Sequence, residues 1–312
     1  MSRVFTFGET MALVRAESGP WETAGTATIG IGGADSNVAI GLARLGVEVS
    51  WLGRVGDDAL GRRVVRELRA EGIDVHARIG PGRTGLMVKQ KRTPHTSDVL
   101  FYRAGSAGST LSPADVPHDV VAADIVHVTG ITAALSPSAR ATVDAVVDLA
   151  RAEGVPVSFD VNHRPSLWQG EDPSPLYRSL AARSDILFAG EDEARLLVDT
   201  TDDDPLALAR AIAALGPAEV LIKSGARGSA GVVDGEEVTR PALAVPVVDT
   251  VGAGDAYVAG YLAARLDGDA AADRIRLATA VGAFACLHIG DWEGLPRRED
   301  LALLDTEEPV TR

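Results

Sequence analysis

The hydrophobic and polar positions along the chain follow two alternating patterns. Short runs rich in β-branched residues predict strands at the start of the chain and at 50–55, 125–128, 155–161, 185–188 and 220–223. Apolar residues at helical spacing predict helices at 37–45, 58–70, 137–153, 191–198, 254–266 and 274–287. Strands separated by helices of about 10–15 residues are typical of βαβ units. The sequence therefore predicts an α/β fold, with a doubly wound, mostly parallel sheet flanked by helices.

Two segments depart from this alternation. Residues 10–31 and 84–103 lack a helical period and contain alternating, strand-like runs such as 86–91. They predict a small antiparallel sheet that stands off the main sheet. A small sheet beside a ligand crevice can act as a lid, so we expect this one to close over a site.

Composition and charge narrow the class of protein. The chain has 312 residues, of which 46% are hydrophobic and 24% are charged, which is typical of a globular protein with one large α/β domain or two smaller ones. The formal net charge of −14 repels nucleic acids and anionic membrane surfaces. We therefore expect neither as a partner, and an anionic substrate would need locally concentrated positive groups.

The expected location is the cytoplasm. No apolar run approaches the roughly 20 residues that span a bilayer, and the first residues show no secretory pattern. Cys286 is the single cysteine, so neither an internal disulfide nor a cysteine-cluster metal site can form. Such cysteine usage fits a reducing compartment.

Three familiar motifs are either absent from the sequence or lack the structural context that they need. Residues 80–85 spell G-x-G-x-x-G, but a strand-like segment follows instead of a helix, so no helix start faces a dinucleotide there. The chain has no P-loop sequence, and its six histidines form no H-E-x-x-H pair. The sequence therefore argues against a Rossmann dinucleotide site, a P-loop enzyme and a zinc site.

A glycine-rich segment at 247–257 carries the strongest chemical signal. A strand leads into Gly252, Ala253 and Gly254, and a helix begins at about 254. Unpaired amides and the dipole at a helix start favour an anion such as a phosphate. Asp255 in that first turn could then take the proton from an attacking hydroxyl. Taken alone, the segment could equally be a plain turn with Asp255 as a helix-start charge.

The wider sequence resembles a known family. The string DTVGAGDA at 249–256, followed by Gly260, is similar to the C-terminal signature of the ribokinase-like (PfkB) sugar kinases. The N-terminal signature is matched by GGADSNVA at 32–39 and continues through 42–46 and 53–58 to Gly61. The resemblance covers nearly the whole chain in order. It implies one domain over 1–312 with a small β lid, formed here by about 10–31 and 84–103.

The resemblance also implies roles for individual residues. Asp255 matches the catalytic base, and Gly252, Ala253 and Gly254 match the anion hole. The expected nucleotide-binding residues are Lys223, Ser224, Gly225 and Gly228, together with Gly252, Gly254 and Thr279. Glu193 matches the acid of an Asn-x-x-Glu motif linked to Mg²⁺. Gly190 stands at the Asn position, so Mg²⁺ would rely on water or Glu191. ATP and Mg²⁺ are the implied cofactors, and a monovalent cation stays open.

Within the family, the segments 102–108, 129–136 and 160–168 are most similar to 2-keto-3-deoxygluconate kinases. That similarity implies a sugar pocket made by Gly33, Asn37, Tyr102, Arg103, Arg164, Asp255 and Asp291. Arg164 would bind the sugar-acid carboxylate, since a guanidinium matches a carboxylate in geometry and charge. Three positions depart from the pattern, namely Met87, Lys89 and Ala104. Structural alternatives stay open for several residues: Tyr102 and Trp168 as packing aromatics, Asp160 as a residue that orders its loop, and Asp291 as a loop acid.

The expected activity is ATP-dependent phosphorylation of the terminal hydroxyl of 2-keto-3-deoxygluconate. One alternative is a kinase of a neutral sugar, such as fructose or ribose, or of a nucleoside. The other is a non-catalytic sugar or nucleotide sensor on the same fold. The resemblance also leads us to expect a homo-oligomer formed through the lid.

Overall fold

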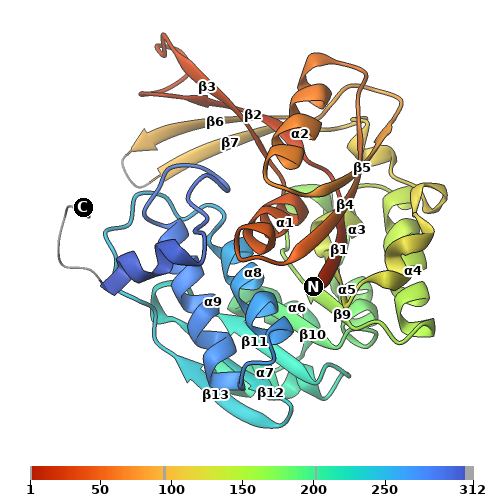
Figure 1. Ribbon diagram of the computed structural model, residues 1–312, viewed down its shortest axis with the longest axis vertical. Helices are drawn as coiled ribbons and strands as arrows, with labels where there is room; N and C mark the ends of the chain where they lie inside the picture. The colour runs from red at the N-terminus through yellow and green to blue at the C-terminus, as the bar shows by residue number, and fades with distance from the viewer. Residues whose placement is uncertain (1, 94–95, 201, 306–312) are drawn as a thin grey trace.

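A large sheet forms the centre of the molecule (Figure 1). The computed structural model describes residues 2–93, 96–200 and 202–305; residues 94–95 of the expected lid segment, and 1, 201 and 306–312 of the expected domain, lie outside this part. Across the described residues the strand order is β13-β12-β11-β10-β9-β8-β1-β4-β5. These strands are β1 (Arg3–Phe7), β4 (Glu48–Val55), β5 (Asp74–Ile79), β8 (Ile125–Thr129), β9 (Val157–Asp160), β10 (Ile186–Gly190), β11 (Glu219–Lys223), β12 (Ser229–Val233) and β13 (Glu236–Arg240).

The pairing within this sheet is parallel from β5 to β11. The hairpin of β12 and β13 adds two antiparallel strands at one edge. Buried apolar runs in β8 to β11 explain the parallel part, because strands covered on both faces have no polar face. The prediction of a doubly wound, mostly parallel sheet is therefore confirmed.

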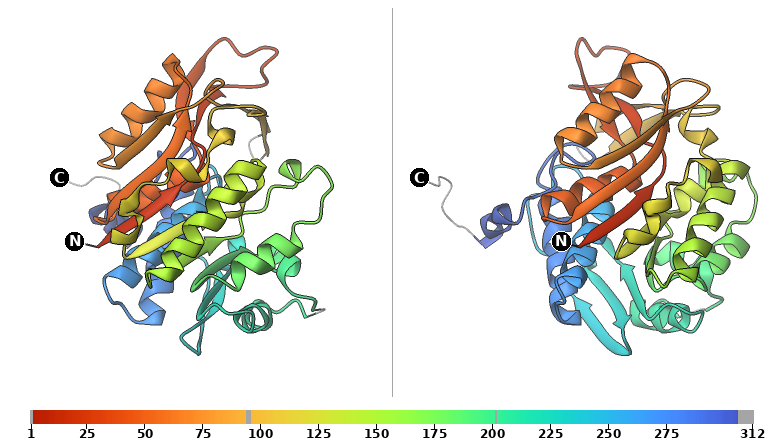
Figure 2. Two further views of the ribbon diagram at one scale, coloured as in Figure 1. Left: turned by 90° about the vertical axis from the view of Figure 1, so that its right-hand side faces the viewer. Right: turned by 45° about the vertical axis from the view of Figure 1, so that its right-hand side comes forward.

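Helices cover both faces of the sheet (Figure 2). One layer consists of α1 (Ala34–Arg44), α2 (Ala59–Ala70), α8 (Ala253–Leu266) and α9 (Ala271–Ala285). The opposite layer consists of α3 (Gly130–Ala134), α4 (Pro137–Ala152), α5 (Ser174–Ala181), α6 (Glu191–Leu197) and α7 (Pro205–Ala213). Each layer encloses its own hydrophobic core, with Trp51 and Tyr261 buried in the first and Phe159 and Tyr177 in the second.

The second sheet has the order β3-β2-β6-β7 and projects from one end of the molecule (Figures 1 and 2). Its strands are β2 (Met11–Ala16), β3 (Ala27–Gly32), β6 (Leu86–Thr93) and β7 (Thr96–Tyr102). The expectation of a purely antiparallel sheet was wrong, because β2 pairs with β6 in parallel. A parallel pair needs a crossover, and here the chain between 33 and 85 supplies one through the main sheet. We call this four-stranded sheet the lid.

The predicted strands and helices are present with shifted ends, except for the strand expected ahead of Gly252, which was wrong: residues 241–250 form a loop. The helices expected at 37–45 and 274–287 run over Ala34–Arg44 and Ala271–Ala285, and the strand expected at 155–161 covers Val157–Asp160. Gly46 follows the first of these helices with φ +86°, a backbone conformation that favours glycine at a helix end. The sequence patterns missed six elements: β5, β12, β13, α3, α5 and α7. In the described residues, every helix is too short or too polar to cross a membrane.

Candidate active site

Polar residues gather where the parallel strands of the main sheet end. Glu9 lies just after β1, Asp160 ends β9, Gly190 ends β10 and Lys223 ends β11. Ligands of open α/β sheets bind at this carboxyl edge. A cavity of about 910 Å³ opens there, between the main sheet, the lid and the start of α8. A cavity of this size and position can hold a small molecule.

Asp255 lies at the base of this cavity, in the first turn of α8. Its side chain is held from two sides: Asn37 Nδ2 donates to Oδ2 at 2.8 Å, and Asn162 Nδ2 donates to Oδ1 at 3.2 Å. Burial raises the pKa of Asp255 to about 6, against the lowering effect of the Asn37 hydrogen bond; nearby Asp160 raises it further, and Lys223 lowers it. A carboxyl group with this pKa can accept and release a proton near neutral pH.

The backbone at the start of α8 is shaped for close approach. Gly252 has φ +78°, and a Cβ placed on it would clash with the carbonyl oxygen of Asp291. Ala256 N donates the first helical bond to Gly252 O, and Ala253 N donates to Thr250 O at 3.3 Å. Among the described residues, the amides of Gly254 and Asp255 have no acceptor. These two amides are therefore free to bind an anion, whereas the Ala253 amide is already engaged.

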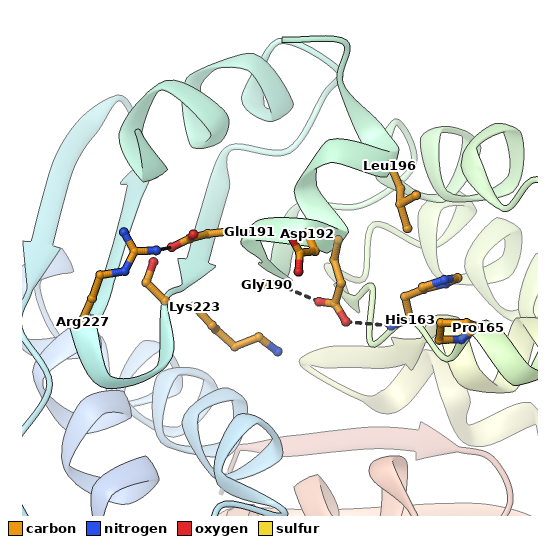
Figure 3. A pocket seen from close by; sticks show the side chains of 10 residues that line it. His163, Pro165, Gly190, Glu191, Asp192, Leu196, Lys223 and Arg227 are labelled. Carbon is orange, nitrogen blue, oxygen red and sulfur yellow. Dashed lines mark hydrogen bonds and ion pairs between the residues drawn. The ribbon is translucent and has the colours of Figure 1, made fainter. Parts of the chain in front are cut away.

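Lys223 stands between two cavities. It lines the larger one and also a second cavity of about 620 Å³, in which its side chain reaches toward the centre (Figure 3). Its ammonium contacts both carboxylate oxygens of buried Asp160 at 2.9 Å. Burial lowers the pKa of Lys223, but Asp160 and Glu193 raise it by more, so it stays charged. Asp160 thus has a charge partner and does more than order its loop.

Glu193 lines both cavities. Its Oε2 accepts from Gly190 N at 2.6 Å, and its Oε1 accepts from His163 N at 2.7 Å (Figure 3). Glu191 is engaged in an ion pair with Arg227. The described residues contain no cluster of three or more His, Cys, Asp or Glu side chains that could hold a metal. The donor set therefore fits a Mg²⁺ ion carried by ligand phosphates and water, with a single carboxylate such as Glu193 beside it.

Four cations of the described chain line the larger cavity: Lys89, Arg103, Arg164 and Lys223. Arg103 binds buried Glu9 through Nε at 2.8 Å and Nη2 at 2.7 Å. Lys89 and Lys223 pair with Asp249 and Asp160. Arg164 is exposed and donates to the carbonyl of His163 at 3.0 Å. Within the described residues it has no carboxylate partner, so its charge is available to an anionic ligand.

The structure brings most of the expected site residues together. Gly33, Asn37, Arg103, Arg164, Asp255 and Asp291 line the larger cavity, as do Gly252 and Gly254. Ser224 lines the smaller cavity. Gly225 and Gly228 form the turn after β11, with φ +56° and +102°, and line neither cavity.

Two expected residues lie apart. Tyr102 is 61% exposed at the end of β7 and does not line either cavity. Thr279 is buried in α9, where its hydroxyl donates to the carbonyl of Ile275 at 2.8 Å. Trp168 is buried and packs edge-on against Tyr177, which agrees with a packing aromatic.

Sequence reasoning missed the roles of Glu9 and Asn162, and understated that of Asp160. A usable signal was present, because all three are polar residues at or just after the end of a buried strand. Positions of this kind meet at one edge of a parallel sheet. Their partners could not be identified without the order of the strands.

Comparisons with known proteins agree over the length of the chain. The family model described as "pfkB family carbohydrate kinase" matches residues 1–298. The 2-dehydro-3-deoxygluconokinase of Bacillus subtilis (strain 168) is 39% identical, over 95% of this chain and 93% of that protein. The 2-dehydro-3-deoxygalactonokinase of Haloferax volcanii is 32% identical, over 86% of each.

Solved structures show the same arrangement. The PfkB protein from Polaromonas sp. JS666 superposes with a TM-score of 0.86 at 35% identity, over 97% of this chain and 99% of that one. A candidate ribokinase II from E. coli, in complex with ATP and Mg²⁺, gives a TM-score of 0.89 at 25% identity, over 98% and 99%. Sequence, fold and site thus agree: the chain belongs to the pfkB family of carbohydrate kinases, which transfer a phosphoryl group to a sugar hydroxyl.

Proposed function

We propose that this chain is an ATP-dependent kinase that phosphorylates the terminal hydroxyl of 2-keto-3-deoxygluconate, the substrate also called 2-dehydro-3-deoxygluconate. The observation that carries the proposal is Arg164, a cation without a carboxylate partner in the described chain, on the cavity that holds Asp255. In a protein of net charge −14, an unpaired guanidinium at a cavity favours a carboxylate ligand. The 39% identity to the Bacillus subtilis enzyme supports the same sugar acid.

In this proposal Asp255 is the general base. The sugar hydroxyl oxygen attacks the γ-phosphorus of ATP, its proton passes to the Asp255 carboxylate, and the bond from the γ-phosphorus to the bridging oxygen breaks to release ADP. Asn37 and Asn162 donate to the two carboxylate oxygens and fix their direction. The base is therefore oriented before the sugar arrives.

The transferred phosphoryl group would lie at the start of α8. The free amides of Gly254 and Asp255 point to where its negative charge develops, and the helix dipole adds to their effect. Lys223 places an ammonium beside the same turn, since a Cβ on Gly254 would lie 3.7 Å from Nζ. The Lys223 ammonium and the two free amides thus offer positive groups to the transferred phosphoryl group.

We propose that the ATP phosphates occupy the smaller cavity, near Ser224 and the turn of Gly225 and Gly228. Mg²⁺ bound to those phosphates would neutralise charge on the transferred group, and we propose Glu193 as the carboxylate beside it, among the three that line this cavity with Glu191 and Asp192. We propose that Tyr102 and Thr279 contact a ligand only in a state in which the lid and α9 have moved.

A requirement for a monovalent cation is tested by exchanging KCl for tetramethylammonium chloride in the kinase assay.

The lid would exclude water, which competes with the sugar as phosphoryl acceptor. On its inner face the apolar side chains of Met11, Leu13 and Met87 are buried beside the cavity, together with the ion-paired Lys89. We therefore propose that residues 1–312 act as one kinase domain, with β2, β3, β6 and β7 as its lid.

The test is ADP release with ATP and Mg²⁺ over a panel of 2-keto-3-deoxygluconate, gluconate, fructose, ribose and adenosine. We expect turnover mainly with 2-keto-3-deoxygluconate. The Arg164→Ala variant should lower kcat/KM for the sugar acid by about 10- to 100-fold, whereas Arg276→Ala, on the exposed face of α9, should not. If the protein turns over a neutral sugar and Arg164→Ala leaves that rate unchanged, the proposed substrate is wrong. If the protein binds a sugar without turnover, it is a sensor.

We further propose a homo-oligomer formed through the lid, in the cytoplasm, where ATP is made and Cys286 would stay reduced. The support is the apolar surface of the lid strands, where Ile29, Leu100 and Phe101 are exposed. Light scattering after size-exclusion chromatography should give a mass above that of one chain. A Leu100→Glu variant should return the mass to that of a monomer.

A further inference from the structure

Lys89 is a buried lysine on the lid that the proposed reaction does not use. It lies on β6, its side chain is 2% exposed, and its Nζ is 2.8 Å from Asp249 Oδ2 and 3.6 Å from Asp291 Oδ1. A buried ammonium is strongly unfavourable unless carboxylates compensate it. Here the two carboxylates belong to the main body, one before α8 and the other after α9. The three groups therefore join the lid to the active-site loops.

Both carboxylates border the turn that leads into α8. Asp249 Oδ1 accepts from Val251 N at 3.3 Å, which fixes the backbone just before Gly252. The carbonyl of Asp291 packs directly over Gly252, where it leaves no room for a Cβ. Any displacement of Asp249 or Asp291 would therefore move the backbone whose amides face the transferred phosphoryl group.

The balance of charge at this point depends on Lys89. Asp291 is buried, and burial raises its pKa to about 6; Lys89 counteracts this effect, while Glu293 and Asp249 add to it. Without the ammonium, Asp249 and Asp291 would be two like charges in a poorly solvated place. They would separate or take up a proton, and both changes alter the turn.

We propose that Lys89 is a positioning residue, whose ammonium is the internal cation that holds Asp249 and Asp291 together and so sets the turn at 249–252 for phosphoryl transfer. The anion-binding turn then reaches its working shape only with the lid in place, because the cation arrives on a lid strand. The inference rests on the phosphoryl-transfer site of the proposed function, but not on which sugar is the substrate.

The experiment compares Lys89→Met and Lys89→Ala with wild type, on the sugar of the panel that wild type turns over best. We expect kcat to fall by about 10- to 100-fold, while the Kd for ATP stays within about threefold. Lys91→Met is the matched control, because Lys91 lies on the same strand and, among the described residues, donates to a carbonyl of the 247–251 loop, Val248 O at 3.2 Å. Its kcat should stay within about twofold.

Chemical rescue separates a positioning cation from a general loss of packing. Ammonium or methylammonium should restore kcat of Lys89→Ala by tenfold or more, on the order of its loss, whereas tetramethylammonium at equal ionic strength should not. With KCl held constant in every assay, wild type should respond to none of them. A kcat within about twofold of wild type in Lys89→Met, or a folded Lys89→Ala that no small cation rescues, would overturn the proposal.

A double variant covers the case in which Lys89→Met folds poorly or wild type is inactive on every sugar of the panel. Lys89→Met/Asp249→Asn removes the cation and one of its carboxylates together, so it should melt above Lys89→Met alone. A double variant that melts lower than the single one would contradict the internal cation. Inactive wild type would overturn the proposed sugar, while this comparison still decides the role of Lys89.

Discussion

The pKa of Asp255 is set by opposing influences from its neighbours. Burial raises it, and the Asn37 hydrogen bond stabilises the charged form. The result, about 6, leaves the carboxylate ionised at neutral pH but still basic enough to take a proton from a hydroxyl. One asparagine contact therefore adjusts the pKa of the base.

The first prediction follows for the pH dependence of catalysis. Since only ionised Asp255 can accept the proton, kcat/KM should fall as the pH drops below about 6, approaching tenfold per pH unit. In Asn37→Ala, the loss of a hydrogen bond that lowers the pKa should move this acid limb to higher pH. Initial rates from about pH 5 to about pH 8 measure both. If the acid limb of the pH profile does not move in Asn37→Ala, the assignment of Asp255 as the base is wrong. The Asp255→Asn variant should lose about 10²–10⁴-fold in kcat/KM.

A second buried acid, Asp35, acts on stability. It lies at the start of α1 and accepts from Thr132 Oγ1 at 2.9 Å and from Thr129 Oγ1 at 3.3 Å. Burial raises its pKa to about 7, against the lowering effect of these two hydroxyls. A carboxyl group that is harder to ionise when folded adds stability at low pH, and loses it as the pH rises through the folded pKa.

The second prediction concerns Asp35→Asn, which cannot ionise. The free energy of unfolding of wild type should decline relative to that of the variant between about pH 4 and about pH 7, by up to about 1.4 kcal/mol per pH unit, and the difference should level off above that. Denaturant unfolding at several pH values measures it. Parallel pH curves for the two proteins would show that Asp35 is not the titrating group.

At the scale of elements, the start of α8 depends on one backbone conformation. Gly252 carries φ +78° and faces the Asp291 carbonyl, so it combines conformational strain with lack of space for any side chain. Gly268, just past the end of the same helix, has φ +81° with nothing within 4 Å of a Cβ. A comparison of variants at the two glycines thus distinguishes the effect of backbone strain from the effect of a close neighbouring atom.

The third prediction uses this pair. Gly268→Ala should cost about 1–2 kcal/mol in the free energy of unfolding and leave kcat unchanged, because only a left-handed conformation is strained. Gly252→Ala should be less stable than Gly268→Ala and lose on the order of 10²-fold in kcat, since the helix start must shift away from Asp291. Unfolding curves and kinetics of both variants test it. Equal effects would mean that close approach at Gly252 is unimportant.

At the scale of the whole molecule, the lid and the body meet around the cavity. The main sheet carries two large hydrophobic cores, whereas the lid has a small cluster of Met11, Leu13 and Met87. Elements with little buried apolar surface open at low free energy. Ligand binding should therefore order the lid much more than the sheet.

The fourth prediction is a pattern of amide exchange. A sugar bound in the cavity should slow hydrogen–deuterium exchange in β2 and β6, while β8 to β10 in the sheet centre stay protected throughout. Mass spectrometry of peptides with and without the sugar measures the change. If the bound sugar does not change amide exchange in β2 and β6, the four-stranded sheet does not act as a lid.

The sequence by itself determined the local features of this protein. Apolar periodicity located most strands and helices, and the string at 249–256 located the glycine turn and Asp255, because helical period, strand alternation and backbone conformation depend on neighbouring residues. Some elements were missed nonetheless, such as α7, in which Leu208, Ala209 and Ile212 are buried.

Only the tertiary structure decided which distant residues meet. Asn37 and Asp255 are 218 positions apart, and Lys89 and Asp249 are 160 apart, yet each pair is in contact. The parallel pairing of β2 with β6 was likewise invisible, because a strand's own sequence does not specify its neighbour. Charge partners, and with them the pKa of the base and the role of Lys89, follow from strand order and crossovers. These are properties of the packed molecule rather than of any segment.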